Sequence, residues 1–171
     1  MNAESIQRAQ TWLTDLLSLM GYPTTISVEQ PAFAQERLNH FGGCWLTVEP
    51  DKLKTAQINA LTTADGEALD AIQYLLNVTL NLGQSAETQE AYTVELNQCR
   101  EHHYSRLIDL AEEAAATARQ TQSEFEMPPL TAAERRLVHT LLVSEPNLET
   151  FSQGEGAQRR LIVRYVSGQD S

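Results

Sequence analysis

The stretch Leu-Thr-Ala-Ala-Glu-Arg-Arg-Leu-Val-His-Thr-Leu-Leu, residues 130–142, decides how the C-terminal part of the chain folds. Thr131 is a good N-cap residue, and Glu134, three residues on, can complete a capping box. Apolar residues then recur at spacings of three and four, which places them on one helical face. They are Leu137, Val138, Leu141 and Leu142. We therefore predict an amphipathic helix across this stretch.

The same helix carries Arg135 and His139, four residues apart and so one turn above each other. Arg159 and Arg160 precede a β-rich run some twenty residues later. Arginine stays charged and presents a fork of donors, so such a cluster suits phosphate. The alternative is that His139 caps the sheet or packs on it while Arg135 pairs with a local carboxylate.

Two further features of the C-terminal part are open to two interpretations each. Strand alternation would place Arg160 and Arg164 on one face and Arg159 on the other, so at least one of them can be merely solvated. Ser152 and Gly154 can offer a hydroxyl and open main chain to phosphate, or can simply build a hairpin.

Charge is distributed unevenly along the 171 residues, whose net charge is −11. From residue 130 onward five arginines and five acids cancel, so the whole excess belongs to residues 1–129. The acidic front would repel nucleic acid, and we expect any phosphate contact in the C-terminal part. The cancelling residues are Arg135, Arg136, Arg159, Arg160, Arg164, Glu134, Glu145, Glu149, Glu155 and Asp170.

Several classes of protein are disfavoured by the sequence. Its apolar runs are too short for a membrane span, and its N-terminal residues do not resemble a signal peptide. Cys44 and Cys99 lie far apart, so we expect free thiols, no metal cluster and a cytoplasmic protein. Motifs for nucleophilic catalysis or a phosphate-binding glycine loop are missing, so we predict neither an enzyme nor a cofactor.

Hydrophobic periodicity predicts an α+β fold in two parts. The N-terminal part reads as a helix (4–20), two strands (24–29 and 44–49), a helical turn (57–62), a turn at Asp65-Gly66, a helix (67–82) and a strand (92–96). The C-terminal part reads as a long helix (98–120), a polar linker (120–129), the helix above and two strands (148–152 and 160–166). Residues 31–43 are mixed, with a turn at Gly42-Gly43.

The first of these orders matches the type II KH domain, and residues 61–77 resemble the loop and following helix of the bacterial Jag family. The run Leu69-Asp-Ala-Ile-Gln-Tyr-Leu75 is similar to that family almost residue for residue. Arg135 and His139 resemble the motif of its second module, the R-3-H domain. Thr150-Phe-Ser-Gln-Gly154 followed by Arg159 resembles the next feature of that module. The resemblance implies a three-stranded KH domain (1–97), a connecting helix (98–129) and a small α/β R-3-H domain (130–171), without the N-terminal Jag domain of longer members.

The resemblance is imperfect at the KH loop, which clamps a nucleic-acid backbone with Gly-x-x-Gly. Here the four positions are Thr63, Ala64, Asp65 and Gly66, so the first glycine is replaced and an acid faces the expected phosphate. We expect this loop to bind RNA weakly, or the unit to serve as a scaffold or dimerisation surface.

The resemblance implies a bacterial regulator that binds single-stranded RNA, or else single-stranded DNA, and pairs with a small KH protein or with itself. The alternative is a protein-interaction adaptor that has lost much of its RNA affinity. Trp45 and Phe151 can stack on bases, but we expect both in the core.

Overall fold

A computed structural model describes residues 2–29 and 41–167. The fold is α+β, as predicted, and divides into two compact units. Among the described residues, the N-terminal unit holds 2–29 and 42–103, and the C-terminal unit holds 41 and 104–167. The mixed segment predicted at residues 31–43 lies mostly outside the described residues.

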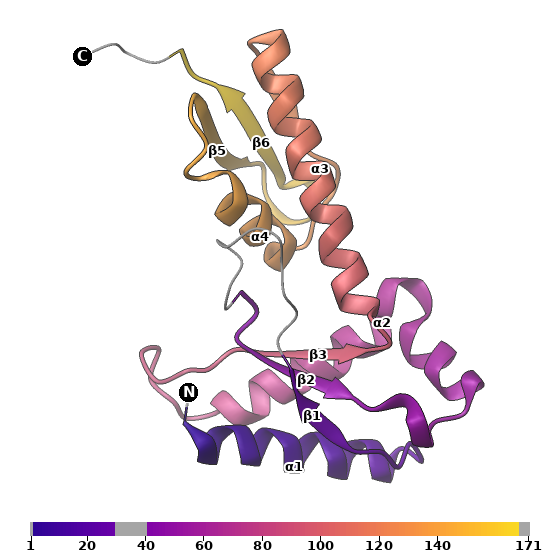
Figure 1. Ribbon diagram of the computed structural model, residues 1–171. Coiled ribbons are helices and arrows are strands. Elements are labelled where there is room, and N and C mark those ends of the chain that lie inside the picture. Colours follow the sequence, from indigo (N-terminus) through magenta and orange to yellow (C-terminus); the bar gives the residue numbers. More distant parts are fainter. Residues whose placement is uncertain (1, 30–40, 168–171) are drawn as a thin grey trace. The chain divides into compact units, whose positions relative to one another are not determined.

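The N-terminal unit is a three-stranded sheet with helices packed on one face (Figure 1). Strand β2 is central, antiparallel to β1 and parallel to β3. The parallel pair requires a crossover, which α2 supplies. The elements are α1 (Ala3–Leu19), β1 (Ile26–Val28), β2 (Cys44–Val48), the 3-10 turn η2 (Pro50–Lys52), α2 (Thr55–Asn81) and β3 (Tyr92–Leu96).

The core of this unit follows from strand alternation. Leu46 and Val48 of β2 point to the helical side together with Val94 and Leu96 of β3, and all four are fully buried. Helix α1 contributes apolar residues at helical spacing to the same cluster. Trp45, on the other face of β2, is 1% exposed, which confirms its predicted burial.

Helix α2 runs through the predicted loop at residues 63–66, which corrects the expectation of a separate helical turn and helix. The turn is nevertheless visible in the backbone, because Ala64 has φ 53° and Gly66 has φ 86° within the helix. A Cβ at Gly66 would lie 3.1 Å from the Sγ of Cys99, so glycine suits both the conformation and the space.

The C-terminal unit has an antiparallel sheet in the order β4-β6-β5. Helix α4 packs against β5, and most of the long helix α3 belongs to this unit (Figure 1). The elements are α3 (Cys99–Thr121), β4 (Glu124–Glu126), α4 (Ala132–Leu142), β5 (Leu148–Gln153), the 3-10 turn η3 (Gly156–Gln158) and β6 (Arg160–Tyr165).

Strand β4 lies inside the polar linker predicted at residues 120–129. Its three residues pair with β6, placing Glu124 opposite Arg164 and Glu126 opposite Ile162. Three residues with two exposed glutamates give almost no periodic signal, so the strand depends on a partner some forty residues away.

The core of the C-terminal unit confirms the apolar face predicted for α4. Leu137 and Val138 are fully buried, as are Val163 of the central strand β6 and Ala114 of α3. Alanines on α3 let neighbouring elements approach closely. No helix in the described ranges 2–29 and 41–167 is long and apolar enough to cross a membrane.

Candidate nucleic-acid interface

An open groove of about 380 Å³ lies in the C-terminal unit, between α4, β5 and the residue that precedes β6. It contains four of the residues predicted from sequence to contact phosphate: Arg135, His139, Ser152 and Arg159. The other lining residues are Ala132, Arg136, Thr150, Phe151 and Leu161.

The position of the groove residues on α4 depends on where the helix begins, which is fixed by its N-cap. The side chain of Thr131 accepts from the backbone N–H of Glu134, and the Glu134 carboxylate accepts from the backbone N–H of Thr131. This confirms the predicted capping box. Because the helix begins at Ala132, Arg135 and His139 lie one turn apart beside the apolar face.

Arg135 is half-buried and partly fixed. Its Nη1 donates to the carbonyl oxygen of Leu130 at 2.5 Å, just before the helix. A guanidinium carries five N–H donors, so one hydrogen bond to a carbonyl leaves several for a ligand. Arg135 is thereby oriented without being neutralised.

His139 is exposed and hydrogen-bonded across the groove. Its Nδ1 lies 2.5 Å from the Oγ1 of Thr150 on β5. The other ring nitrogen, Nε2, has no hydrogen bond to any residue that the structure describes. His139 thus contacts the sheet, as the alternative interpretation expected, but its second ring nitrogen is left for a ligand.

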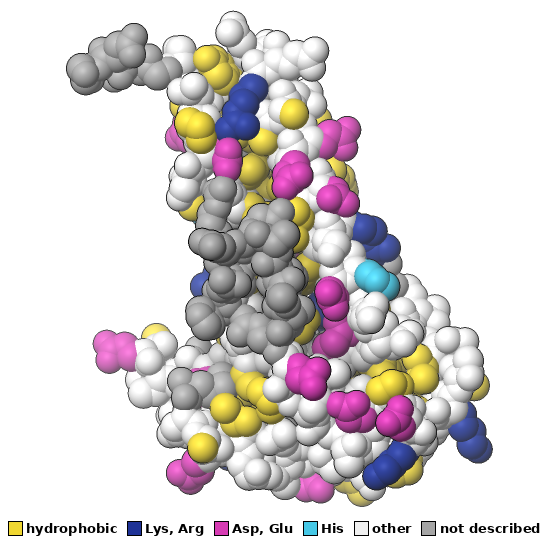
Figure 2. Space-filling model, in the orientation of Figure 1, with side chains coloured by type: hydrophobic (Ala, Val, Ile, Leu, Met, Phe, Trp, Pro, Cys, Tyr) yellow, Lys and Arg dark blue, Asp and Glu magenta, His cyan; other side chains and the backbone are white. Residues whose placement is uncertain are grey.

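Three groove arginines have no acidic partner in the part of the chain that the structure describes. Within residues 2–29 and 41–167, no carboxylate oxygen lies within ion-pairing distance of Arg135, Arg136 or Arg159. The carboxylate nearest in sequence, that of Glu134, caps the start of α4. The groove therefore concentrates positive charge on a chain of net charge −11. Figure 2 shows how sparse basic side chains are on the face drawn, where acidic ones are scattered widely.

Two other arginines of this unit, Arg160 and Arg164, lie near carboxylates. Arg164 donates from Nη2 to Glu149 at 2.7 Å and from Nη1 to Glu124 at 3.4 Å, and the hydrogen bond to Glu149 raises the pKa of Arg164. Arg160 donates to the carbonyl of Ala157, and its Nε lies 3.9 Å from a Glu126 oxygen. Arg160 does not line the groove.

The hairpin residues differ in what they offer. Ser152 is exposed and lines the groove. Gly154 has φ 86°, and a Cβ there would lie 2.7 Å from the carbonyl oxygen of Gln158. Glycine is thus required by the turn itself. Gly154 is not among the groove-lining residues.

The four predicted KH-loop residues lie in the N-terminal unit, on α2. Thr63 is exposed, and its hydroxyl donates to the carbonyl of Asn59 one turn earlier. Ala64 is exposed, whereas Gly66 is buried. The side chain of Asp65 lies outside the described part of the structure.

Sequence reasoning missed two polar groove residues, Arg136 and Thr150. Arg136 is exposed beside Arg135 and carries the same charge, so the Arg-Arg pair was a usable signal. Thr150 belongs to the quoted Thr-x-Ser-x-Gly run, but its contact with His139 depends on how α4 packs on β5. Phe151, expected in the core, is half-buried, with Arg164 4.8 Å from its ring centre.

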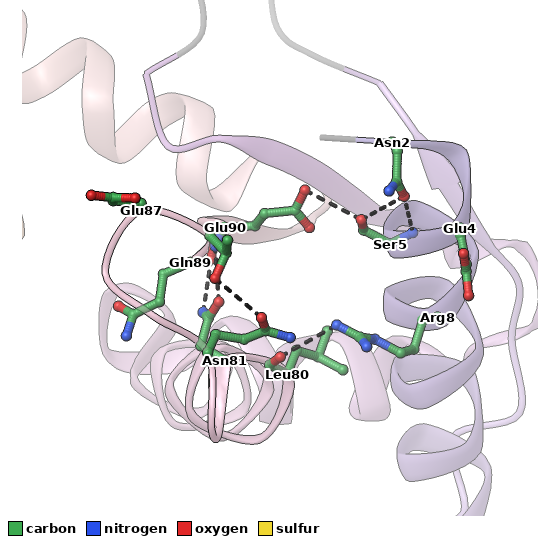
Figure 3. A pocket seen from close by; sticks show the side chains of 11 residues that line it. Asn2, Glu4, Ser5, Arg8, Leu80, Asn81, Glu87, Gln89 and Glu90 are labelled. Atoms are coloured by element: carbon green, nitrogen blue, oxygen red, sulfur yellow. Dashed lines mark hydrogen bonds between the residues drawn. The ribbon is translucent and has the colours of Figure 1, made fainter.

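A larger pocket, of about 680 Å³, lies in the N-terminal unit and contains none of the predicted residues (Figure 3). Several of its polar side chains form hydrogen bonds within the N-terminal unit. Glu90 accepts from Ser5 and from Tyr92, whose pKa rises to about 12 through burial and that hydrogen bond. Asn81 bonds the backbone of Glu90, and Arg8 donates to the carbonyl of Leu80. These contacts fix the loop before β3.

Neither a disulfide nor a metal site is found among the residues that the structure describes. Neither Cys44 nor Cys99 is joined in a disulfide, as predicted, and burial raises the pKa of the Cys44 thiol. No group of three or more His, Cys, Asp or Glu side chains there is arranged to hold a metal ion.

Comparison with known proteins identifies the unit that carries the groove. Residues 105–165 match the R-3-H domain, so this part of the chain is an R-3-H domain. The match includes every residue that lines the groove.

Three curated proteins named RNA-binding protein KhpB are similar to the chain. The protein from Clostridium symbiosum is 27% identical over 111 residues, which is 65% of this chain and 49% of that protein. The one from Bacillus subtilis is 26% identical over 102 residues, 58% of this chain and 48% of that protein. The one from Lactiplantibacillus plantarum is 26% identical over 123 residues, 72% and 37% respectively. The chain thus spans half or less of the relatives it matches, and its resemblance to the Jag family is confirmed.

Proposed function

We propose that this chain, whose C-terminal unit is an R-3-H domain, binds single-stranded RNA by holding phosphates in the groove between α4 and β5. The observation that carries the proposal is the set of three arginines, Arg135, Arg136 and Arg159, that share this groove without a described acidic partner. Relatives named RNA-binding proteins support RNA as the ligand.

The chemistry of the groove suits the phosphodiester backbone of a nucleic acid. Guanidinium forks bind phosphate oxygens in bidentate fashion, and the Ser152 hydroxyl and the second ring nitrogen of His139 can add further hydrogen bonds. Three arginines can contact about three phosphates of a single strand. The rest of the chain is acidic and would repel further phosphates, so we expect the affinity for RNA to be moderate. Because the contacts are ionic, the affinity should fall as the salt concentration rises.

We propose that the N-terminal unit is a type II KH domain that contributes little to binding. Its α-β-β-α-β order and its parallel β2-β3 pair support that fold. Two features weaken its loop: Thr63 replaces the first glycine and commits its hydroxyl to Asn59, and Asp65 adds a negative charge. We propose 1–97 as the limits of the KH-like part, and we extend the R-3-H part expected at 130–171 back into the connection expected at 98–129, because the match begins at residue 105.

The test is fluorescence anisotropy with a short labelled single-stranded RNA at several salt concentrations. Replacing Arg135, Arg136 and Arg159 together by glutamine should abolish most binding and reduce the slope of log K against log salt by about 2, the value for three phosphate contacts to a single strand. A matched control replaces Arg8, Lys52 and Lys54, three exposed bases of the N-terminal unit. Equal losses in the two triple variants, or no binding by the folded wild type at low salt, would reject the proposal.

A second candidate function, protein interaction, is favoured by an apolar stripe on α2 and on Leu82, the residue that follows the helix. Tyr74, Leu75, Val78 and Leu82 are all exposed, Leu82 by 81%. Residues 71–86 contain no Asp, Glu, Lys, Arg or His. Two copies could therefore meet at this stripe without bringing like charges together, which the rest of an acidic chain would oppose. We propose a second copy of this chain as the occupant.

Analytical ultracentrifugation tests the stripe. Wild type should sediment as a dimer at micromolar concentration, and Tyr74→Lys with Val78→Lys should be monomeric with unchanged RNA affinity. A monomeric wild type would remove the self-association proposal and leave a different KH protein as the occupant to be tested.

A further inference from the structure

We infer that Thr150 is a positioning residue for RNA binding: its hydroxyl donates to Nδ1 of His139 and so holds Nε2–H toward the groove as a hydrogen-bond donor. The inference rests on the proposed function, because it assigns the task of a groove residue. The Nδ1–Oγ1 distance of 2.5 Å carries it, together with the position of both residues in the groove lining.

Thr150 is better fixed than the histidine it contacts. It lies on β5 opposite Val163, a fully buried residue of the central strand β6, and is itself half-buried. A β-branched side chain in a strand has few χ1 rotamers. His139 is exposed on α4 and could otherwise exchange between several rotamers. The hydrogen bond to this well-ordered strand residue therefore restricts the rotation of the imidazole ring.

The direction of the hydrogen bond between Thr150 and His139 decides whether Nε2 of His139 is a donor or an acceptor toward the groove. A neutral imidazole carries one proton, so the nitrogen that accepts from Thr150 leaves the proton on the other. If Thr150 donates, Nε2–H can bind a phosphate oxygen. If Thr150 accepted instead, Nε2 would present a lone pair, which repels phosphate. For the neutral ring, a groove lined by three arginines favours the first arrangement, because only that one presents a donor to an anion.

A short side chain with a hydroxyl suits this task at position 150. A hydroxyl can turn to donate to Nδ1 of the neutral ring or to accept from Nδ1–H of the charged ring. Valine has nearly the shape of threonine and suits a strand equally well, but has no hydroxyl. Thr150→Val therefore removes the hydrogen bond with little change in packing, and Thr150→Ser restores it.

The first measurement is NMR of the imidazole nitrogens of the free protein, which does not depend on RNA. Wild type and Thr150→Ser should show the Nε2–H tautomer with Nδ1 shifted as a hydrogen-bond acceptor, and Thr150→Val should lose that shift. An Nδ1–H tautomer in the wild type would overturn the inference, whether or not the protein binds RNA.

The second measurement is RNA affinity in a double-mutant cycle. Thr150→Val should weaken binding about as much as His139→Ala, roughly threefold to tenfold, with the salt slope unchanged because the arginines remain. Thr150→Ser should bind like wild type, and Thr150→Val should add nothing in the His139→Ala background. A further loss in that background would show that Thr150 acts independently of His139. Absence of binding by the wild type, with the expected tautomer, would reject the proposed function and leave the orientation of His139 intact.

Discussion

Arg159 and Arg160 are neighbours in sequence but belong to different surfaces of the C-terminal unit. Arg159 is exposed and lines the groove. Arg160 begins β6, where its Nε lies 3.9 Å from a Glu126 oxygen and its Nη1 donates to Ala157 at 2.7 Å. Strand alternation separates the two side chains, so a single Arg-Arg pair contains one candidate phosphate ligand and one structural cation.

This separation predicts opposite outcomes for two equal charge changes. Arg159→Gln should weaken RNA binding by about tenfold and lower the salt slope by about 0.7, the value for one phosphate contact to a single strand. Arg160→Gln should leave affinity within about twofold, because its guanidinium faces Glu126. Anisotropy titrations at several salt concentrations measure both, with circular dichroism to confirm folding. A larger loss of RNA affinity for Arg160→Gln than for Arg159→Gln would indicate that phosphate binds on the other face of the sheet.

Arg135 and Arg136 allow a test of geometry at constant charge. Arg135 is held by the Leu130 carbonyl, whereas the Arg136 side chain has no hydrogen bond to the residues that the structure describes. A lysine keeps the charge but lacks the planar fork. Arg135→Lys should therefore weaken binding by about tenfold, roughly 1.4 kcal/mol, while Arg136→Lys costs less than about threefold. Isothermal titration with single-stranded RNA measures the difference. Equal effects would mean that the groove attracts RNA by charge alone.

Local signals in the sequence predicted much of this arrangement. The N-cap Thr131 and its partner Glu134 define the start of α4 within one short segment, so the relation of Arg135 to His139 followed directly. The alternation of residues 92–96 likewise gave β3 with its observed bounds. These features depend on neighbours within a few residues.

What could not be predicted depends on partners distant in sequence. The roles of Arg159 and Arg160 differ because Glu126 of β4 lies near β6, and β4 itself has no signal of its own. Phe151 looked like a core residue, but it lies on the edge strand β5, where burial is incomplete. Residue type indicated which side chains can bind phosphate, and sheet pairing decided which of them are free to do so.

The left-handed backbone at Ala64 predicts a stabilising substitution. Ala64 has φ 53° and is exposed, and this conformation costs a residue with a Cβ about 1 kcal/mol. Ala64→Gly should therefore raise the melting temperature by a few degrees. Ala71→Gly, at an exposed helical position of the same α2, should lower it, since glycine costs about 1 kcal/mol inside a helix. Calorimetry measures both. Equal destabilisation would show that Ala64 is helical in solution.

Burial of Glu95 predicts a pH-dependent stability. Glu95 is 7% exposed at the end of β3, and desolvation raises the pKa of its carboxyl although the backbone N–H of Glu101 donates to Oε2 at 2.9 Å. Its Oε1 has no hydrogen-bond partner among the described residues. Because the folded pKa lies above the unfolded one, the folded state binds the proton more tightly, and stability falls as pH rises through that interval.

Glu95→Gln removes the buried charge and keeps an oxygen for the Glu101 N–H. The variant should therefore melt above wild type at pH 7, and the difference should shrink as pH falls below the ordinary carboxyl range, where Glu95 is protonated in both states. Thermal melts across this pH range measure the effect, with Glu67→Gln, an exposed site on α2, as the matched control. A gap that stayed constant with pH would show that the gain comes from packing, and a variant less stable at pH 7 would show that the carboxylate charge stabilises the start of α3 more than burial penalises it.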